Sequence, residues 1–309
     1  MKICGQIVLT QDKFLILIYN MDDNDFNVYP LKQDPKEKPD RDLPSIFPTG
    51  SFNTLIVGSS QTGKTINATS MLCRENMYGC HKGKDYFKNI IIISSTLGSD
   101  ESIEPIKEKA TATYDFYDDS IVKDIIGYCK QHKDSGSKDR TLILADDIIS
   151  IVPQNSAINK AFSNCRHWNI SIMAILQGIR GTISPIARAN THFWVCYRLH
   201  SQKERIKLFE ELSFLDSEKE VELMYNHCTA QPYNFMAVNA KTLEVYHNFT
   251  TPLWSRYNPD GTYAPSFSTQ KQSKESEESV LSDNKTDVPI ENNNLDNKNN
   301  DEIKSNNNI

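Results

Sequence analysis

The chain has 309 residues, enough for one large domain with attachments, and its formal net charge of -6 gives the whole molecule no electrostatic case for binding nucleic acid. Its seven cysteines are an odd number without paired spacing, which argues against a disulfide framework and favours free thiols in a reducing compartment. No apolar stretch is long enough to cross a bilayer and no secretory signal is visible, so we expect an intracellular protein without a transmembrane segment.

Residues 1–46 are predicted to form a small β attachment and a linker. Short apolar runs at residues 7–9 and 14–19 predict a hairpin or edge strands. Residues 33–50 are rich in charge and proline, as in Asp34-Pro35-Lys36, and predict an exposed loop. We therefore expect the main domain to begin at residue 47.

Residues 47–252 are predicted to form one α/β domain in which strands alternate with helices. Strands are expected at residues 52–57, 90–94, 141–147, 170–176 and 193–198, with helices at 66–76, 121–129, 157–167 and 185–190. Two amphipathic helices at 203–212 and 217–225 and a hairpin at 235–238 and 243–246 complete the domain, whereas residues 114–117 are predicted to be irregular. This alternation indicates a doubly wound, mostly parallel sheet sandwiched by helices.

Residues 253–309 are predicted to be a linker followed by a polar tail. From about Ser268 the sequence turns to Lys, Glu, Ser, Asp and Asn. Such a composition cannot bury enough apolar surface to offset chain entropy, so we expect the tail to be disordered.

The strongest motif is a G-x-x-x-x-G-K-T segment, placed between a predicted strand and a predicted helix. Its residues are Gly58, Ser59, Ser60, Gln61, Thr62, Gly63, Lys64 and Thr65. The glycines allow the loop amides to surround phosphate oxygens, and the following helix adds the positive end of its dipole. Lys64 is predicted to bind the terminal phosphates of a nucleotide, and the Thr65 hydroxyl is predicted to hold Mg²⁺.

A second motif is the pair of carboxylates, Asp146 and Asp147, that follows the apolar run of residues 142–145. The carboxyl ends of strands are where ligands of open α/β sheets bind. Asp146 is predicted to hold Mg²⁺, and Asp147 to orient or deprotonate the attacking water. A strand that simply ends in a solvated acidic turn is the alternative, and the nearby phosphate loop argues against it.

The predicted strand at residues 90–94 is expected to lie between the phosphate-loop strand and the acidic strand. An inserted strand and a second acidic residue are typical of RecA-like P-loop ATPases that use a carboxylate base, whereas kinases and GTPases place the two strands side by side. No Asn-Lys-x-Asp segment for reading guanine is evident within residues 47–252, so ATP is favoured over GTP.

Two weaker candidates follow in the chain. Gln177 ends the strand after the acidic one, where its amide could sense the terminal phosphate or position water, although a polar residue at a strand end is equally consistent with the spacing. Arg188 could reach the nucleotide of a neighbouring subunit as an arginine finger, or it could form a surface salt bridge. Arg166 and Arg180 compete for the same role.

The segment at residues 165–172, followed by Gln177, residues 185–190 and an aromatic strand, resembles the genome-packaging ATPases of poxviruses, other large DNA viruses, virophages and virus-like transposons. These ATPases belong to the FtsK–HerA superfamily of ring-forming DNA motors. The resemblance covers roughly residues 47–250, supports Gln177 as a phosphate sensor, and makes Arg188 the preferred finger. Bacterial relatives usually have Glu where this chain has Asp147, and the shorter side chain is like that of the viral branch.

The resemblance implies an ATP- and Mg²⁺-dependent enzyme that packages double-stranded viral DNA into a capsid. It further implies a homo-oligomeric ring of five or six subunits, capsid or portal partners, and a location in the host cytoplasm, the virus factory or the virion. The sequence leaves two alternatives open: a helicase-like ATPase of viral DNA replication, and a nucleotide-gated scaffold without catalysis.

Overall fold

The computed structural model of the chain describes residues 43–148, 152–153, 155–181 and 183–273, together with two short strands, β1 (Val8–Leu9) and β2 (Leu15–Ile16). The chain divides into two compact units, Met1–Asp42 and Leu43–Ile309. In the first unit, β1 and β2 pair in antiparallel fashion, as the predicted hairpin requires. The predicted disordered tail lies outside the described residues from 274 onward, and residues 267–273 are helical.

The second unit is built on one nine-stranded sheet with the order β11-β10-β9-β8-β3-β7-β6-β4-β5. Its strands are β3 (Asn53–Val57), β4 (Asn89–Ser94), β5 (Ala112–Tyr114), β6 (Thr141–Asp146), β7 (Ile170–Leu176), β8 (Phe193–Tyr197), β9 (Phe235–Asn239), β10 (Glu244–His247) and β11 (Thr251–Ser255). The strands from β8 to β5 in this order are parallel, and β9, β10 and β11 extend the sheet in antiparallel fashion. The predicted α/β fold with a mostly parallel sheet is confirmed.

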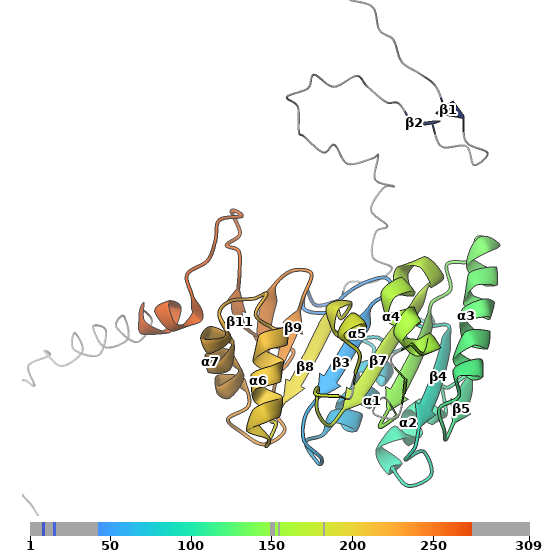
Figure 1. The fold of residues 1–309 in the computed structure, drawn as a ribbon, viewed down its shortest axis with the longest axis horizontal. Coiled ribbons are helices and arrows are strands. Elements are labelled where there is room, and N and C mark those ends of the chain that lie inside the picture. The colour runs from blue at the N-terminus through green and yellow to red at the C-terminus, as the bar shows by residue number, and fades with distance from the viewer. Residues whose placement is uncertain are drawn as a thin grey trace, which may run out of the picture. The chain divides into compact units, whose positions relative to one another are not determined.

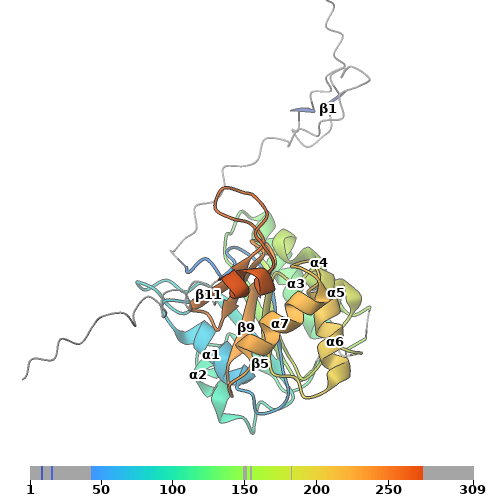
Figure 2. The ribbon, with the colours of Figure 1, turned by 90° about the vertical axis from the view of Figure 1, so that its left-hand side faces the viewer.

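Helices cover both faces of the sheet (Figure 1). They are α1 (Lys64–Cys73), α2 (Glu104–Lys107), α3 (Asp119–Asp134), α4 (Ala157–Trp168), α5 (Pro185–Ala189), α6 (Gln202–Glu211) and α7 (Glu218–Cys228), with a 3-10 turn, η1 (Glu101–Ile103), before α2. Figure 2 shows α1 and α2 on one side of the sheet and the helices from α3 to α7 on the other. In the described part of the chain, every helix is too short or too polar to cross a bilayer.

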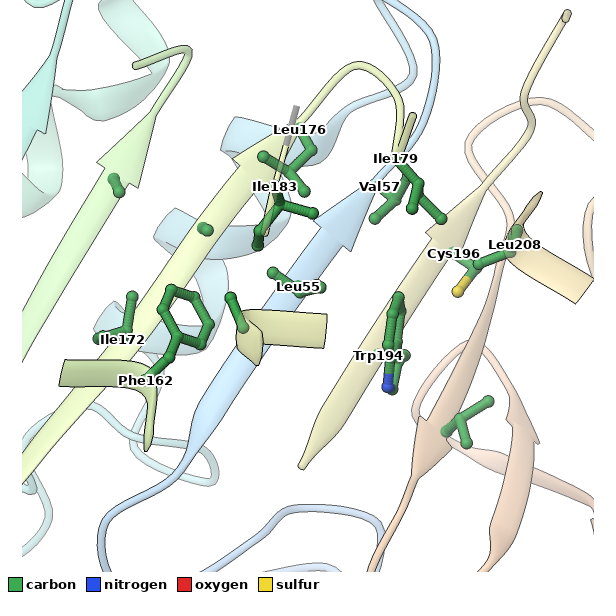
Figure 3. Close-up of a cluster of buried hydrophobic side chains, with 14 of the residues drawn as sticks. Leu55, Val57, Phe162, Ile172, Leu176, Ile179, Ile183, Trp194, Cys196 and Leu208 are labelled. Carbon is green, nitrogen blue, oxygen red and sulfur yellow. The ribbon is translucent and has the colours of Figure 1, made fainter. Parts of the chain in front are cut away.

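The two hydrophobic cores follow from the alternation of side chains along each strand. On β3, Leu55 and Val57 face the core under the helices from α3 to α7, whereas Ile56 faces the core under α1. Figure 3 shows the first core, where Trp194 and Cys196 of β8 lie on the same face of the sheet as Leu55 and Val57. Because both faces are covered, the central strands are buried along their whole length and appear in the sequence as continuous apolar runs.

Local signals set several helix boundaries. The Asp118 carboxylate accepts a hydrogen bond from the Ser120 N–H at 2.7 Å and begins α3, and the Ser184 hydroxyl accepts one from the Ala187 N–H at 3.1 Å and begins α5. Asn169 adopts left-handed backbone angles at the end of α4, and β7 starts at the next residue. The turn at Asn169 thus returns the chain from α4 directly to the sheet.

The strand inserted between the phosphate-loop strand and the acidic strand is β7, not the strand at residues 90–94 as predicted. β7 pairs with β3 on one side and with β6 on the other, and β4 lies beyond β6. The periodicity of a sequence identifies strands, but the helical crossovers set their order in space, and here the chain first moves outward to β4 and then returns through β6 to β7. The prediction that one strand lies between the phosphate-loop strand and the acidic strand is therefore confirmed. The prediction that this strand is residues 90–94 was wrong.

Several elements were not predicted. The stretch predicted to be irregular begins at the end of β5, which has only three residues at the sheet edge. β11 continues the sheet past residue 252, the expected end of the domain, and Trp254 and Phe267 are both buried in the first core. The short elements η1 and α2 pack on α1, where Ile103 and Ile106 are fully buried.

Candidate active site

The phosphate loop connects β3 to α1 at the carboxyl end of the parallel strands. Gly58 begins the loop because a Cβ at this position would lie 2.5 Å from the Cβ of Tyr197 on β8. Its N–H donates to the carbonyl oxygen of Leu176 at 3.1 Å, and the Ser59 N–H donates to that of Arg198 at 3.1 Å. The loop is thus anchored to the ends of β7 and β8.

Gly63 ends the loop with a φ of 89°, a left-handed conformation that favours glycine. It caps α1 without any side-chain hydrogen bond, and the first turn of α1 contains no acidic residue. The first N–H groups of a helix have no partners within the helix, so this end of α1 presents donors and a positive dipole. Such an end fits a phosphate group.

Lys64 is largely buried, with 8% of its surface exposed, and its Nζ donates to the Ser59 carbonyl oxygen at 2.8 Å. Burial lowers the pKa of Lys64, and the negative charges of Asp147 and Asp146 act in the opposite direction. The ammonium group therefore lies in the field of both carboxylates. A terminal phosphate would offer it a better partner than a backbone carbonyl does.

Asp146 ends β6 and is only 3% exposed. Burial raises its pKa to about 7, with further contributions from the charges of Asp147 and Asp100, while Lys64 opposes the shift. Within the described residues no hydrogen-bond donor meets this carboxylate. A buried acid without a donor is costly as an anion unless a cation binds it.

The donor set of the site fits Mg²⁺. A hard divalent cation takes oxygen ligands, and the buried carboxylate of Asp146 and the hydroxyl of Thr65, for which the described residues provide no partner, are both of that kind. Asp146 lies in the field of Lys64, which is adjacent to Thr65 in the chain. A divalent cation beside the phosphate loop would therefore give the Asp146 carboxylate a partner.

Gln177 lies directly after β7 and connects the loop to the acidic pair. Its Nε2 donates to the two carboxylate oxygens of Asp147 at 3.2 and 3.3 Å, and its Oε1 accepts from the Ser60 hydroxyl at 3.2 Å. Asp147 itself adopts a φ of 53°, unusual for a residue other than glycine. The insertion of β7 between β3 and β6 is what places Gln177 between these groups.

Within the described part of the chain, the side chains of the three arginines considered as fingers form no hydrogen bond with this group of residues. Arg188 donates from Nε to the Glu211 carboxylate at 2.8 Å and from a terminal nitrogen to the Ile183 carbonyl oxygen at 2.6 Å, with 11% of its side chain exposed. Arg180 and Arg166 are exposed. Within one chain, Arg188 thus forms the salt bridge that was the alternative to the finger.

Tyr233 lies beside the candidate site, and the sequence did not reveal this position. It lies in the turn between α7 and β9, is 71% exposed, and has a φ of 65°. Its Cδ1 would be 3.4 Å from a Cβ built on Gly63, so the ring stands against the phosphate loop. An exposed aromatic residue 170 positions from the loop carries no local signal, because only the fold brings the two together.

The sequence matches a known protein family over most of the described α/β unit. A family model described as "Poxvirus A32 protein" matches residues 47–229, which is more than half of the chain. This match confirms the resemblance to poxvirus proteins that the residues between Cys165 and Asn190 indicated. Among curated protein sequences, no relative matches.

Solved structures with a similar arrangement include viral and bacterial ATPases. The DNA-packaging ATPase B204 from Sulfolobus Turreted Icosahedral Virus has a TM-score of 0.45 at 15% identity, covering 64% of this chain and 96% of that one. The genome packaging NTPase B204 from Sulfolobus turreted icosahedral virus 2, in complex with AMP, has a TM-score of 0.44 at 14% identity with the same coverage. EssC (ATPases 2 and 3) from Geobacillus thermodenitrificans has a TM-score of 0.41 at 13% identity, covering 51% and 34%.

Proposed function

We propose, since this chain belongs to the poxvirus A32 protein family, that it is an ATP- and Mg²⁺-dependent motor that moves double-stranded viral DNA into a capsid. One observation carries the ATPase part of the proposal. The phosphate loop, the acidic pair and Gln177 meet at one edge of the sheet, where Gln177 hydrogen-bonds both Ser60 and Asp147. This arrangement combines a phosphate cradle with a carboxylate that could accept a proton from water.

Each residue has a distinct role in this proposal. The amides of residues 58–65 and the N-terminus of α1 bind the phosphates, and Lys64 leaves the Ser59 carbonyl to neutralise the terminal one. Thr65 and Asp146 would hold Mg²⁺, which supplies positive charge to the phosphate oxygens when bound. Asp147 accepts the proton of the attacking water, and Gln177 fixes the orientation of the Asp147 carboxylate.

Tyr233 offers a contact for the purine ring of the nucleotide. Its exposed ring stands beside Gly63, and an aromatic face of this kind stacks on a purine. We assign the nucleotide as ATP, because residues 47–252 contain no Asn-Lys-x-Asp segment for guanine, and the Asn-Lys-Thr-Asp stretch at residues 284–287 lies in the polar tail. Stacking alone does not discriminate between purines, so that assignment depends on the absence of the segment from the ATPase domain.

The motor part of the proposal rests on the family. A packaging motor would act as a homo-oligomeric ring, a pentamer or hexamer, docked on capsid or portal components. Arg188 is the preferred residue for completing a neighbour's site, and it would first have to leave Glu211. The six cysteines in the described residues are free thiols, in keeping with the cytoplasmic virus factory or a virion assembled there.

The decisive experiment measures ATP turnover of the full chain with and without double-stranded DNA, together with particle size in solution. We expect Mg²⁺-dependent turnover that DNA stimulates and a particle several times the 35.2 kDa mass of one chain. Lys64→Ala should abolish turnover, and near-normal activity in that variant would refute the assignment of the phosphate loop. Absence of turnover in the wild type would favour the scaffold alternative, and strand displacement would favour the helicase.

A further inference from the structure

A second concave site lies at the edge of the sheet opposite the phosphate loop. It is a pocket of about 470 Å³, and His192 in its wall accepts a hydrogen bond at Nδ1 from the Asn53 N–H at 3.1 Å. Asn53 begins β3, whereas the phosphate loop follows the other end of that strand. The pocket is therefore separated from the nucleotide site by the length of β3.

The wall of this pocket is basic. Arg166 and His167 come from the last turn of α4, and Lys241 comes from the turn between β9 and β10. No carboxylate is among the described residues that line it. Arg166 and Lys241 are exposed, and within the described part of the chain neither side chain forms an ion pair. Two cations thus face one cavity without a counter-charge.

The state of His192 is consistent with this excess of positive charge. Because Nδ1 accepts the hydrogen bond from Asn53, the proton of the neutral ring is on Nε2. Burial, and then the charges of Arg166 and Lys241, lower the pKa of His192 to about 4. The ring is therefore neutral at pH 7 and offers an N–H donor beside two cations. Such a set of donors without an acceptor fits an oxyanion.

The positive charge continues along the surface from the pocket. Lys133, at the end of α3, donates to the Arg166 carbonyl oxygen at 2.7 Å, and Lys130 lies over the Trp168 ring at 4.5 Å from its centre. A single small anion in the pocket would leave Lys130 and Lys133 without a role. A set of cations along one surface suits the regularly spaced phosphates of a polymer.

We propose that this pocket binds a backbone phosphate of duplex DNA, with Arg166 and Lys241 as its two cationic contacts. The inference rests on the proposed function and names the surface through which that motor would hold its substrate. Contacts of this kind position the duplex without reading its sequence. They also explain how a chain with a net charge of -6 can bind DNA, since the charge is local.

The test measures binding of the full chain to a fluorescent DNA duplex by anisotropy, at salt concentrations from about 50 to 200 mM. Arg166→Ala and Lys241→Ala should each weaken binding to all sequences alike, and the double variant, which removes the whole phosphate contact, should reduce the slope of the logarithm of the binding constant against the logarithm of the salt concentration by about 0.9. Lys241→Glu places a carboxylate at the exposed rim and should weaken binding further. The double variant Lys109→Ala/Lys219→Ala removes the same charge from exposed positions elsewhere and should leave the slope unchanged.

The possible results separate this inference from the proposed function. If the wild type binds DNA and the pocket variants bind it with the same slope, the pocket assignment is overturned while the motor stands. If DNA binding is unchanged but ATP turnover without DNA is lost, the anion is the neighbouring subunit's nucleotide, and the DNA assignment fails. If the wild type has ATPase activity but no affinity for DNA, the motor function itself is refuted.

Discussion

The side-chain amide of Gln177 donates a hydrogen bond to the Asp147 carboxylate over 3.2 Å. The Oε1 atom of Gln177 accepts a hydrogen bond from the Ser60 hydroxyl at 3.2 Å, so one residue joins the phosphate loop to the candidate catalytic base. Any movement of the loop on nucleotide binding would therefore be transmitted to the carboxylate through two hydrogen bonds. We therefore expect Gln177 to position Asp147 and not to act as an independent catalyst.

Replacing Gln177 should affect turnover more than binding. Gln177→Leu removes both hydrogen bonds at similar size, and we expect kcat to fall roughly 10- to 100-fold while the Kd for ATP changes little. Gln131→Leu, in α3 and away from the site, is the control. Steady-state kinetics and fluorescent-nucleotide binding give the two quantities. A variant whose Kd rises as much as its kcat falls would show that Gln177 acts on the phosphates instead.

Asp147→Asn should retain ATP binding and lose most turnover, because the amide cannot accept a proton. If Gln177 acts through Asp147, the double variant Gln177→Leu/Asp147→Asn should be no slower than Asp147→Asn alone. Single-turnover rates of the four proteins complete this cycle. Additive losses would mean that the two residues act separately, and unchanged turnover in Asp147→Asn would place the base elsewhere.

The pH dependence of the site follows from Asp146. Its pKa of about 7 exceeds the value of about 4 for an unfolded aspartate, so without Mg²⁺ the native state binds more protons than the unfolded state between those pH values. The free energy of unfolding should therefore decrease as pH rises from about 4 to about 7 and be constant above. Urea denaturation at several pH values measures this, and Asp146→Asn should remove that part of the slope.

The affinity for Mg²⁺ should depend on pH through the same carboxyl group, Asp146. The metal needs the ionised carboxylate, so below pH 7 its binding expels a proton and the apparent affinity should rise by up to about tenfold per pH unit, then level off. Titration calorimetry in two buffers of different ionisation heat counts the proton. Asp147→Asn removes a negative charge that raises the pKa of Asp146, so the pH at which the Mg²⁺ affinity levels off should decrease. An affinity that is independent of pH between about 5 and 8 would contradict the assignment.

The sequence predicted the fold where local patterns were strong and missed what depends on spatial order. The buried parallel strands and the phosphate loop carry continuous apolar runs and glycines, so their positions were predicted closely. β5 is too short to show a pattern, and the place of β7 between β3 and β6 depends on crossovers that no local pattern encodes. Tyr233 and the basic pocket arise only where distant segments meet, for example Arg166 and Lys241.

The ion pair between Arg188 and Glu211 allows a test of the trans finger. Arg188→Ala in mixed rings should lower activity more than dilution predicts, but it also removes a structural contact and should reduce stability by about 1 to 3 kcal/mol. Glu211→Gln breaks the same ion pair and leaves the arginine charged. A finger predicts that Glu211→Gln keeps turnover while Arg188→Ala loses it. Equal losses of turnover in both variants, or a loss proportional to the fraction of variant subunits on mixing, would contradict the finger role.

Tyr233 should contribute to nucleotide affinity only through contact with the purine ring of the nucleotide. Stacking of an aromatic ring on a base contributes about 1 to 3 kcal/mol, so Tyr233→Ala should weaken ATP binding roughly 5- to 150-fold. Tyr233→Phe retains the ring and should bind ATP almost normally. Inorganic tripolyphosphate has no base, so its affinity should be the same in the wild type and in Tyr233→Ala. Competition against a fluorescent ATP analogue measures both ligands.

Tyr263 provides a matched control for this series. Its side chain is also 71% exposed, but its ring packs at a tilt against Tyr257 in the segment after β11, with the ring centres 5.3 Å apart. Tyr263→Ala should therefore leave the affinities for ATP and tripolyphosphate unchanged. If Tyr233→Ala weakens both ligands equally, the ring supports the conformation of the loop at Gly63 and does not meet the base, because a stacking residue has nothing to bind in tripolyphosphate.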